Sequence, residues 1–337
     1  MVKKTLFVLM ITTLLSSTLV GCSNGGKTTS GKKVELLRVA HNQGENHPIH
    51  KALLEFEKEV EKNSNAEIDV QVFPNEILGS QREAVELTQT GAIDISVASI
   101  SLLESFEEMY SVFNVPYLFD SKEHYYSVMN DKEILGTLFE QTRNDGFVGL
   151  TWYDAGTRNI YTNKKSIEKP EDLKGMKIRV QQSPTNIKMI ELLGGSPTPM
   201  GFGEVYTALQ QNVIDGAENN EMALITNKHG EVSKYYSYNE HAMIPDILIM
   251  NAKKLDGMSE EHRNIVLDAV NKSNEFEVEE WKKSIEEAKK EAEEMGVKFT
   301  YPDTKPFQEK VMPIHEEFKK NEKVAPIYNK IREKAEK

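Results

Sequence analysis

The hydrophobic positions of this chain follow two periods that alternate along its length. Short apolar or alternating runs, typical of strands, occur at 36–40, 68–73, 93–97, 147–153 and 177–180. Between the first two runs, apolar residues recur every three or four positions, at Ile49, Leu53, Phe56 and Val60, which predicts one face of an amphipathic helix. Strands that alternate with helices at this spacing predict an α/β fold with largely parallel sheets.

Two further helices carry boundary signals. Ser80 is followed three residues later by Glu83, the pattern of a capping box, at the start of a predicted helix that runs through Gln89. A second predicted helix, at 186–193, is followed by Gly194. Glycine adopts the left-handed conformation that closes many helices, so this helix is expected to end there.

The C-terminal third has a different pattern. No proline or glycine occurs from 259 to 294, and the apolar residues recur at intervals of 4, 3, 4 and 3 at Trp281, Ile285, Ala288, Ala292 and Met295. We interpret this segment as one long helix lying across a single protein. A coiled-coil dimer is the alternative, but a seam with two alanines in five positions is thin.

The first 33 residues are interpreted as an export signal and a tether. A basic start at 1–4 precedes an apolar stretch whose longest unbroken run, 6–11, is far shorter than the roughly 20 residues of a membrane-spanning helix. We therefore predict a signal peptide at 1–21. The segment 22–33 is rich in Gly, Ser, Thr and Lys and is predicted to be a flexible tether.

Cys22 is the only cysteine of the chain. The residues 19–21 before it resemble a bacterial lipobox, in which such a cysteine becomes N-terminal and lipid-modified. We therefore expect an extracytoplasmic protein anchored to the cell membrane as a lipoprotein; the alternative is a chance cysteine after an ordinary signal peptide. One cysteine also excludes a disulfide scaffold and a Cys-rich zinc module.

Length and charge narrow the class further. The 337 residues correspond to about two domains. Lys and Arg number 41 against 53 Asp and Glu, so the chain carries a net charge of −12, which becomes −14 when residues 1–21 and their two lysines are removed. Because nucleic-acid binding needs a basic surface, we expect no nucleic-acid partner.

No motif of an enzyme stands out. The chain has no Gly-x-Ser-x-Gly element, and Gly201–Tyr206 lacks the third glycine of a dinucleotide-binding fingerprint. His41, His47 and His50 lie close in sequence, but their spacing fits no common zinc site. We expect no cofactor and no metal. A carbohydrate-active hydrolase with paired carboxylates is an alternative, although nothing marks two of the many carboxylates out.

Two arginines lie where α/β sheets bind ligands. Arg158 follows the strand that ends at Tyr153, and Arg179 lies within the strand at 177–180. Ligands of open α/β sheets bind at the carboxyl ends of strands, and a guanidinium offers a planar fork of donors that matches a carboxylate. Taken alone, an arginine at such a position is usually exposed or paired within the protein.

Four runs of residues carry a family resemblance. In order along the chain they are LKGMKIRV at 173–180, GGSPTPM at 194–200, EVYTALQ at 204–210 and VIDGAENN at 213–220. Together they resemble the DctP-type solute-binding proteins of tripartite ATP-independent periplasmic (TRAP) transporters. The resemblance extends from about residue 34 to the C-terminus, which is essentially the whole mature chain.

This resemblance implies an extracytoplasmic binding protein rather than an enzyme. The family has a two-lobe periplasmic-binding-protein-like fold, with hinge strands between the lobes and a long C-terminal helix spanning both. It implies one lobe at 34–155 plus 246–284 and another at 156–245 plus 285–337. A small organic acid binds between the lobes, the lobes close, and the protein, expected to be a monomer, delivers it to the membrane subunits of a TRAP permease.

The family pattern also suggests ligand-binding residues. Arg179 matches the arginine that pairs with the ligand carboxylate, Arg158 matches a second cleft arginine, and Asn219 matches an asparagine that contacts the ligand. Such cations suit an acidic protein that must hold an anion against its own field, and an asparagine can donate and accept hydrogen bonds at once. Glu218 is interpreted as structural.

Further residues resemble the sugar-acid branch of the family, whose members take uronates such as D-glucuronate and D-galacturonate. The resemblance lies around Glu83 and in the segments that contain Gln181 and His241. The Glu83 carboxylate could accept hydrogen bonds from two sugar hydroxyls or serve only in its capping box. His41, Gln181 and His241 could contact further hydroxyls or be structural.

Other interpretations stay open at this point. Within the family, the two arginines could instead hold the two carboxylates of a C4-dicarboxylate. Outside it, the chain could be a sensor or adhesion lipoprotein. Trp152 and Tyr153 could form an aromatic wall for a sugar, but packing in the core is the favoured interpretation.

Overall fold

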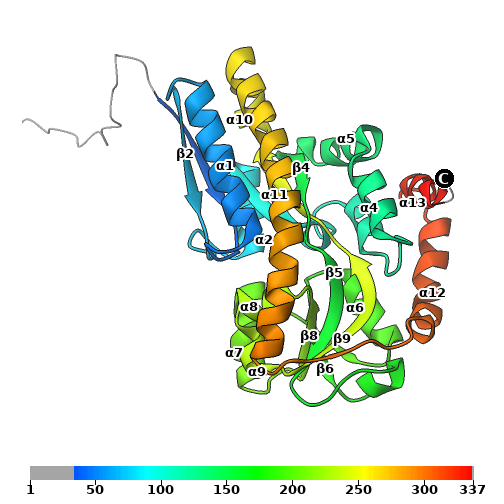
Figure 1. Ribbon diagram of the computed structural model, residues 1–337. Helices are drawn as coiled ribbons and strands as arrows, with labels where there is room; N and C mark the ends of the chain where they lie inside the picture. Colours follow the sequence, from blue (N-terminus) through cyan, green and yellow to red (C-terminus); the bar gives the residue numbers. More distant parts are fainter. Residues whose placement is uncertain (1–33, 336–337) are drawn as a thin grey trace, which may run out of the picture.

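The computed structural model describes residues 34–335 and consists of two lobes, each built around its own β-sheet (Figure 1). The predicted signal peptide and tether, with Cys22, lie outside these residues. Among the described residues, no helix is long and apolar enough to cross a membrane. The predicted α/β class with two lobes is confirmed.

The first lobe holds a five-stranded sheet in the order β2-β1-β3-β10-β4. Its strands are β1 (Glu35–Ala40), β2 (Ile68–Phe73), β3 (Ile95–Ser99), β4 (Phe147–Tyr153) and β10 (Asp246–Asn251). Its helices are α1 (Pro48–Asn63), α2 (Gln81–Thr90), α3 (Ile100–Leu103), α4 (Lys122–Met129), α5 (Lys132–Glu140) and α10 (Ala252–Gly257), with the 3₁₀ helices η1 (Glu108–Asn114) and η2 (Arg143–Asp145).

The second lobe holds a six-stranded sheet in the order β11-β9-β5-β8-β6-β7. Its strands are β5 (Thr157–Thr162), β6 (Lys177–Val180), β7 (Ser196–Pro199), β8 (Gly216–Asn219), β9 (Tyr235–Met243) and β11 (Lys298–Thr300). Its helices are α6 (Pro184–Leu192), α7 (Val205–Gln210), α8 (Met222–Ile225) and α9 (His229–Val232), with the 3₁₀ helices η3 (Pro170–Leu173) and η4 (Phe202–Glu204).

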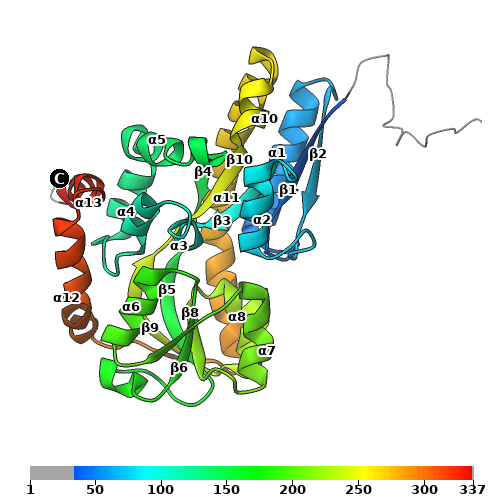
Figure 2. The ribbon, with the colours of Figure 1, turned by 180° about the vertical axis from the view of Figure 1, so that it is seen from behind.

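The sheets are less parallel than the sequence pattern predicts. Of the nine strand pairings within residues 34–335, five are parallel and four are antiparallel. All four antiparallel pairings involve β5 or β10, the strands that follow directly after the chain has crossed from the other lobe (Figure 2). These strands enter without a crossover helix, which a parallel neighbour would require.

Local signals explain where the predicted helices begin and end. Ser80 and Glu83 form the expected capping box at the start of α2. The helix predicted at 186–193 is α6, and Gly194 after it has a positive φ of 92°. Ser259 caps the long C-terminal helix, and its side chain accepts a hydrogen bond from the backbone N–H of His262.

The long helix α11 (Glu260–Glu294) runs along both lobes (Figure 1). It packs against α1 and β4 of the first lobe and against α8 of the second. Trp281, Ala288 and Ala292 are buried on this face. The apolar stripe is therefore covered by the chain itself, which confirms one long helix and leaves the coiled-coil alternative without a free seam.

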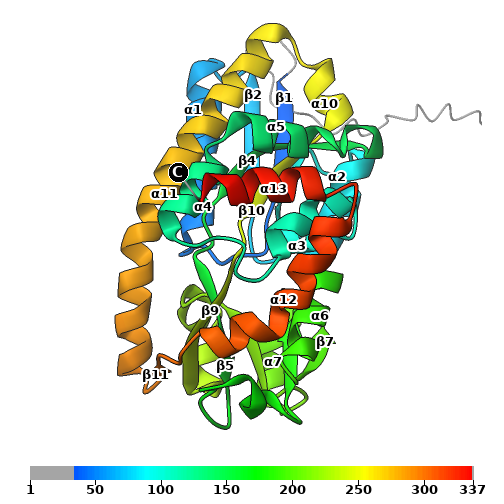
Figure 3. The same ribbon diagram turned by 90° about the vertical axis from the view of Figure 1, so that its right-hand side faces the viewer.

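The two C-terminal helices connect the lobes on another side of the molecule (Figure 3). α12 (Lys305–Lys320) packs against α6 and β9, and α13 (Ala325–Lys334) packs against α4 and η1. The end of the described chain has thus returned to the first lobe.

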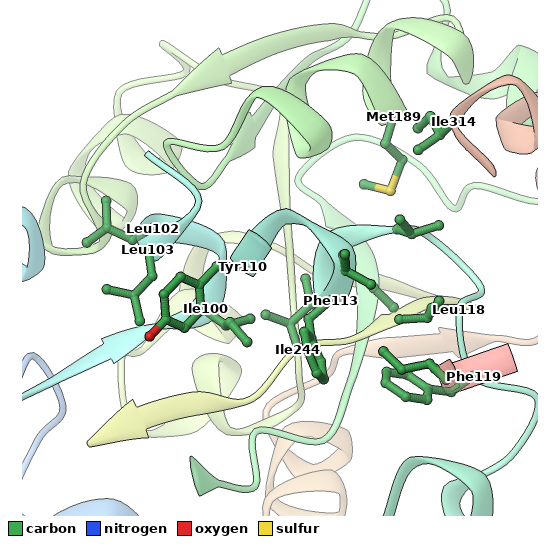
Figure 4. Packing of buried hydrophobic residues seen from close by; sticks show 14 of the residues in the cluster. Ile100, Leu102, Leu103, Tyr110, Phe113, Leu118, Phe119, Met189, Ile244 and Ile314 are labelled. Atoms are coloured by element: carbon green, nitrogen blue, oxygen red, sulfur yellow. The ribbon is translucent and has the colours of Figure 1, made fainter. Parts of the chain in front are cut away.

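The largest apolar cluster lies at the junction of the lobes (Figure 4). Ile100 and Tyr110 of the first lobe belong to it together with Met189 of the second, Ile314 of α12 and Ile244 between β9 and β10. Trp152 is part of the same cluster, and Tyr153 is part of a second one. Both aromatic side chains are therefore core residues.

Candidate ligand-binding site

A cavity lies between the lobes, where the chain crosses from one to the other. The crossings are the short segments at 154–156 and 244–245 (Figure 2). The cavity is lined by residues of both lobes and of the crossings: Asn42, Gln43, His47, Ser80, Gln81, Arg82, Leu102, Ala155, Arg158, Arg179, Gln181, Gln182, Met200, Gly201, Phe202, Glu204, Asn219, Asn220 and Asp246. Arg158, Arg179, Gln181 and Asn219 of the predicted site are thus brought together.

The lobes touch each other beside this cavity. Arg82 of the first lobe donates from Nε to Oε1 of Gln182 at 3.1 Å. The Ser105 hydroxyl donates to the carbonyl of Gln182 at 2.9 Å, and Glu104 accepts from the Thr185 hydroxyl at 2.7 Å. These contacts hold the two walls of the cavity facing each other.

Arg179 is a buried cation whose charge has no partner of its own. It lies on β6, is 3% exposed, and donates from Nε and Nη2 to the carbonyl of Met200 at 3.2 and 2.9 Å. Its guanidinium lies over the Phe202 ring at 5.6 Å, and no carboxylate of residues 34–335 forms a salt bridge with it. Burial lowers its pKa to about 10, so it is charged at neutral pH and keeps free donors.

Arg158 is equally buried, but its charge is compensated. It lies on β5 and donates from Nη2 to Oε1 of Glu218 at 2.9 Å and from Nε to the other carboxylate oxygen. Burial opposes ionisation of Glu218, yet the charge of Arg158 and the hydrogen bonds from Arg158 and His241 outweigh it and hold the pKa of Glu218 at about 2. The predicted structural role of Glu218 matches this geometry.

The same network orients Asn219 at the end of β8. Its Oδ1 accepts from Nη1 of Arg158 at 2.9 Å and from the backbone N–H of Asn220 at 2.9 Å. Because both hydrogen bonds occupy the oxygen, the side-chain amide of Asn219 has its Nδ2 donor left for the cavity. Arg158 therefore positions a donor as well as lining the site.

His47 lines the cavity and was not among the residues predicted for it. It caps α1, and its Nδ1 accepts from the backbone N–H of Ile49 at 3.2 Å. Burial, with the nearby charge of Lys51, lowers its pKa to about 3, so the ring is neutral and its one proton is on Nε2. The sequence feature that could have indicated this position is a histidine directly before Pro48, where a helix begins.

Four buried amide oxygens of the lining lack a hydrogen-bond donor. They are the side-chain oxygens of Asn42, Gln43, Gln181 and Asn220, none of which has a partner among the described residues. Buried polar atoms are nearly always hydrogen-bonded in folded proteins. These oxygens therefore mark places where a ligand that carries donors, such as hydroxyl groups, gains hydrogen bonds.

The other three predicted residues do not line the cavity. The Glu83 carboxylate accepts from the backbone N–H and hydroxyl of Ser80 at 2.7 and 2.8 Å. The side chain of His41 lies 3.0 Å, Nε2 to Nδ1, from that of His50. His41, His47 and His50 form no metal-binding group, and none exists elsewhere in residues 34–335.

His241 contacts the site through Glu218. Its Nε2 lies 3.3 Å from Oε2 of that carboxylate, and its side chain is fully buried. Burial lowers the pKa of His241, although Glu218 acts in the opposite direction. His241 is therefore a neutral donor to the carboxylate that holds Arg158.

Comparison with known proteins points to one family. Residues 39–321 match the family model described as bacterial extracellular solute-binding protein, family 7. The uncharacterized protein YiiZ of Salmonella typhimurium is 43% identical over 326 residues, which cover 96% of this chain and 97% of that protein.

Two solved structures have the same fold and hold sugar acids. A TRAP periplasmic solute-binding protein from Anaerococcus prevotii, with bound α/β-D-glucuronate, is 53% identical with a TM-score of 0.88, covering 90% of this chain and 98% of that one. One from Sulfitobacter sp. NAS-14.1, with bound β-D-galacturonate, is 33% identical with a TM-score of 0.86, covering 89% and 100%.

Proposed function

This chain belongs to bacterial extracellular solute-binding protein family 7, and from that premise we propose that it captures a hexuronate, such as D-glucuronate or D-galacturonate, and delivers it to a TRAP permease. The members of this family are the solute-binding proteins of TRAP transporters, not enzymes. The hydrolase alternative is therefore dropped. The ligand is bound, released and chemically unchanged.

The observation that carries the proposal is the unpaired charge of Arg179 in the interlobe cavity. A buried cation is costly unless an anion compensates it, and a carboxylate matches the geometry of its free donors. When the lobes close, water is excluded and the attraction between Arg179 and the ligand carboxylate becomes stronger. The ligand is thus an organic acid whose carboxylate pairs with Arg179.

The amide oxygens without donors favour a sugar acid over a C4-dicarboxylate. Asn42, Gln43, Gln181 and Asn220 can accept from ligand hydroxyls. Succinate and other C4-dicarboxylates bring a second carboxylate to these amides. Its oxygens are hydrogen-bond acceptors, so the amide oxygens remain without donors. A uronate supplies one carboxylate, which pairs with Arg179, and several hydroxyl donors for the amide oxygens.

For the seven residues suggested by the sequence, we propose two kinds of role. Arg179, Asn219 and Gln181 contact the ligand directly, and Arg158 contacts it while holding Asn219 in place. The remaining three act through neighbours: Glu83 through Ser80, His41 through Gln43, and His241 through Glu218. Replacing Glu83 by alanine is then expected to weaken sugar-acid binding only slightly.

The remaining parts of the proposal concern organisation in the cell. We propose lobes at 34–155 plus 246–284 and at 156–245 plus 285–337, a division supported by the membership of the two sheets; α13, at the end of the second stretch, packs back against the first lobe. The mature protein is a monomer outside the cytoplasm, attached to the membrane by a lipid on Cys22. Metabolic labelling with a fatty-acid analogue, compared between the wild type and Cys22→Ser, tests the anchor.

A thermal-shift screen of purified protein tests the proposed ligand class. The panel contains D-glucuronate, D-galacturonate, D-gluconate, sialic acid and succinate. A ligand at 100 times its Kd adds about 2.7 kcal/mol to the free energy of unfolding, a shift that is readily measured. The hexuronates are expected to give the largest shifts; a larger shift with succinate, or none with any acid, contradicts the proposal.

A further inference from the structure

Asp246 is a buried carboxylate inside a cavity built for an anion. It begins β10, where the chain re-enters the first lobe, and it is 6% exposed. The cavity lining contains one other carboxylate, Glu204, which is exposed and accepts from the backbone N–H of Gly201 at 3.2 Å. Asp246 is therefore the buried negative charge that a ligand meets.

Its carboxylate has no hydrogen-bond donor among residues 34–335, and its charge interacts with that of Arg158. Burial raises its pKa to about 6, against the lowering effect of Arg158. A buried carboxylate without donors is costly, so a ligand that brings donors to it gains binding energy.

Asp246 and Arg179 lie at two different ends of the cavity. Arg179 lies on β6, and Arg158 lies two strands away on β5, in the order β6-β8-β5. Asp246 begins β10 of the first lobe, so Arg179 and Asp246 line the cavity from different lobes. A ligand whose carboxylate pairs with Arg179 therefore directs its other end toward Asp246.

The buried charges around the cavity limit the number of negative charges that the ligand can carry. Arg158 and Arg179 contribute two positive charges, and Glu218 and Asp246 contribute two negative charges when both are ionised. A monocarboxylate adds one negative charge beside Arg179. A dicarboxylate adds a second one at the end where Asp246 already lies, in a desolvated space where like charges repel strongly.

We propose that Asp246 selects the ligand by charge: its carboxylate accepts hydrogen bonds from the hydroxyls of a sugar acid and repels a second carboxylate. This inference rests on the proposed function, because it assumes that the ligand carboxylate pairs with Arg179. It assigns the preference for a monoacid to one side chain, which lies directly after the crossing at 244–245.

The test compares two acids of the same sugar configuration, one with a single carboxylate and one with two. D-glucarate is the open-chain diacid with the configuration of D-glucuronate at carbons 2 to 5, and succinate serves as a dicarboxylate without hydroxyls. Calorimetric Kd values are measured for each acid with the wild type and with Asp246→Asn. The difference between ring and open chain is the same for the wild type and the variant, so the comparison of the two proteins isolates the effect of Asp246. The ratio of the Kd for D-glucarate to that for D-glucuronate is expected to fall at least about tenfold in the variant.

Asp94→Asn is the matched control. Asp94 is also 6% exposed, but it binds Arg38 through Nε at 3.1 Å and is absent from the cavity lining. Its ratio is expected to equal that of the wild type. Because a ratio of two Kd values does not depend on the active fraction of a preparation, a general loss of stability does not imitate the effect. If Asp246→Asn does not fold, Asp246→Ser is measured instead.

The outcomes separate the two proposals. If the wild type binds D-glucuronate and the ratio does not change in the Asp246 variant, the inference is overturned while the proposed function stands. D-glucarate binding that is undetectable in both proteins overturns it as well. If the wild type binds no hydroxy acid, the proposed function fails and the inference with it.

Discussion

Arg158 and Arg179 have much in common and yet differ in what surrounds their charges. Both lie on the second sheet, both line the interlobe cavity, and both are 3% exposed. Arg158 forms a salt bridge with the fully buried Glu218. Arg179 meets a backbone carbonyl and an aromatic face instead.

The comparison shows that burial alone does not identify a ligand-binding arginine. A buried guanidinium is compensated either within the protein or by what the protein binds. The cluster around Arg158 is internally satisfied and holds Asn219 in place. The cluster around Arg179 keeps its charge for an anion, and the two arginines should therefore respond oppositely to the same substitution.

The largest effect is expected from Arg158→Met in the protein without ligand. The variant leaves Glu218 buried without its counter-charge, so the free energy of unfolding should fall by about 3–5 kcal/mol. Urea unfolding monitored by circular dichroism measures it. The double variant Arg158→Met/Glu218→Met should recover most of the loss; a single variant as stable as the wild type would show that the pair is unimportant.

Arg179→Met should leave the stability of the ligand-free protein nearly unchanged and weaken ligand binding. The ligand-free variant should unfold within about 1 kcal/mol of the wild type, because no salt bridge is lost. Its affinity for D-glucuronate should fall at least about 100-fold, or about 2.8 kcal/mol, since the ligand carboxylate is then buried unpaired. Calorimetry and urea unfolding of the same preparation measure both. Near-normal affinity would refute the assignment of Arg179.

The pH dependence of stability sharpens the comparison. The folded pKa of Glu218, about 2, lies below its unfolded value. Its contribution is therefore complete above the unfolded pKa and is lost as pH falls toward the folded pKa. Between pH 4.5 and 3 this loss amounts to about 1.5 kcal/mol.

The matched measurement uses unfolding free energies of the wild type and the Arg158→Met/Glu218→Met double variant over this range. The wild type should lose about 1.5 kcal/mol more than the double variant on acidification. Arg179→Met should follow the wild-type curve, because Glu218 and Arg158 are still paired in it. Parallel curves for the wild type and the double variant would contradict the depressed pKa.

The smallest effect is expected next to Arg179. Gln181→Leu removes one amide oxygen that lacks a donor and retains a similar volume. Loss of one neutral hydrogen bond should weaken D-glucuronate binding by about 3- to 10-fold. Succinate, which has no hydroxyl to donate, should bind the variant and the wild type alike. Equal losses for both acids would place Gln181 outside hydroxyl recognition.

The sequence predicted most of the elements and part of the site. The strands at 36–40, 68–73, 147–153 and 177–180, the capping box of Ser80, and the long helix all agree with the structure. These features depend on residues that are neighbours along the chain, so periodicity and capping signals report them directly. The four motifs identified the family, which the comparisons confirm.

The antiparallel strands β5 and β10 and the site residues His47 and Asp246 were not predicted. β5 and β10 acquire their direction from crossings between lobes, which leave no period in the hydrophobic pattern. His47 and Asp246 reach the cavity from the two separate stretches of the first-lobe sequence. Their role depends on neighbours that folding brings to them.

By itself, the amino-acid order determined the class of fold, the long helix and the presence of arginines suited to an acid. Only the tertiary structure decided which charges are compensated inside the protein: Glu218 forms a salt bridge with Arg158, and no carboxylate of the described residues, 34–335, forms one with Arg179. The physical reason is that hydrophobic spacing acts over a few residues of one segment. The balance of charge in a desolvated cavity is instead set by side chains that are distant in sequence and meet only when both lobes are folded.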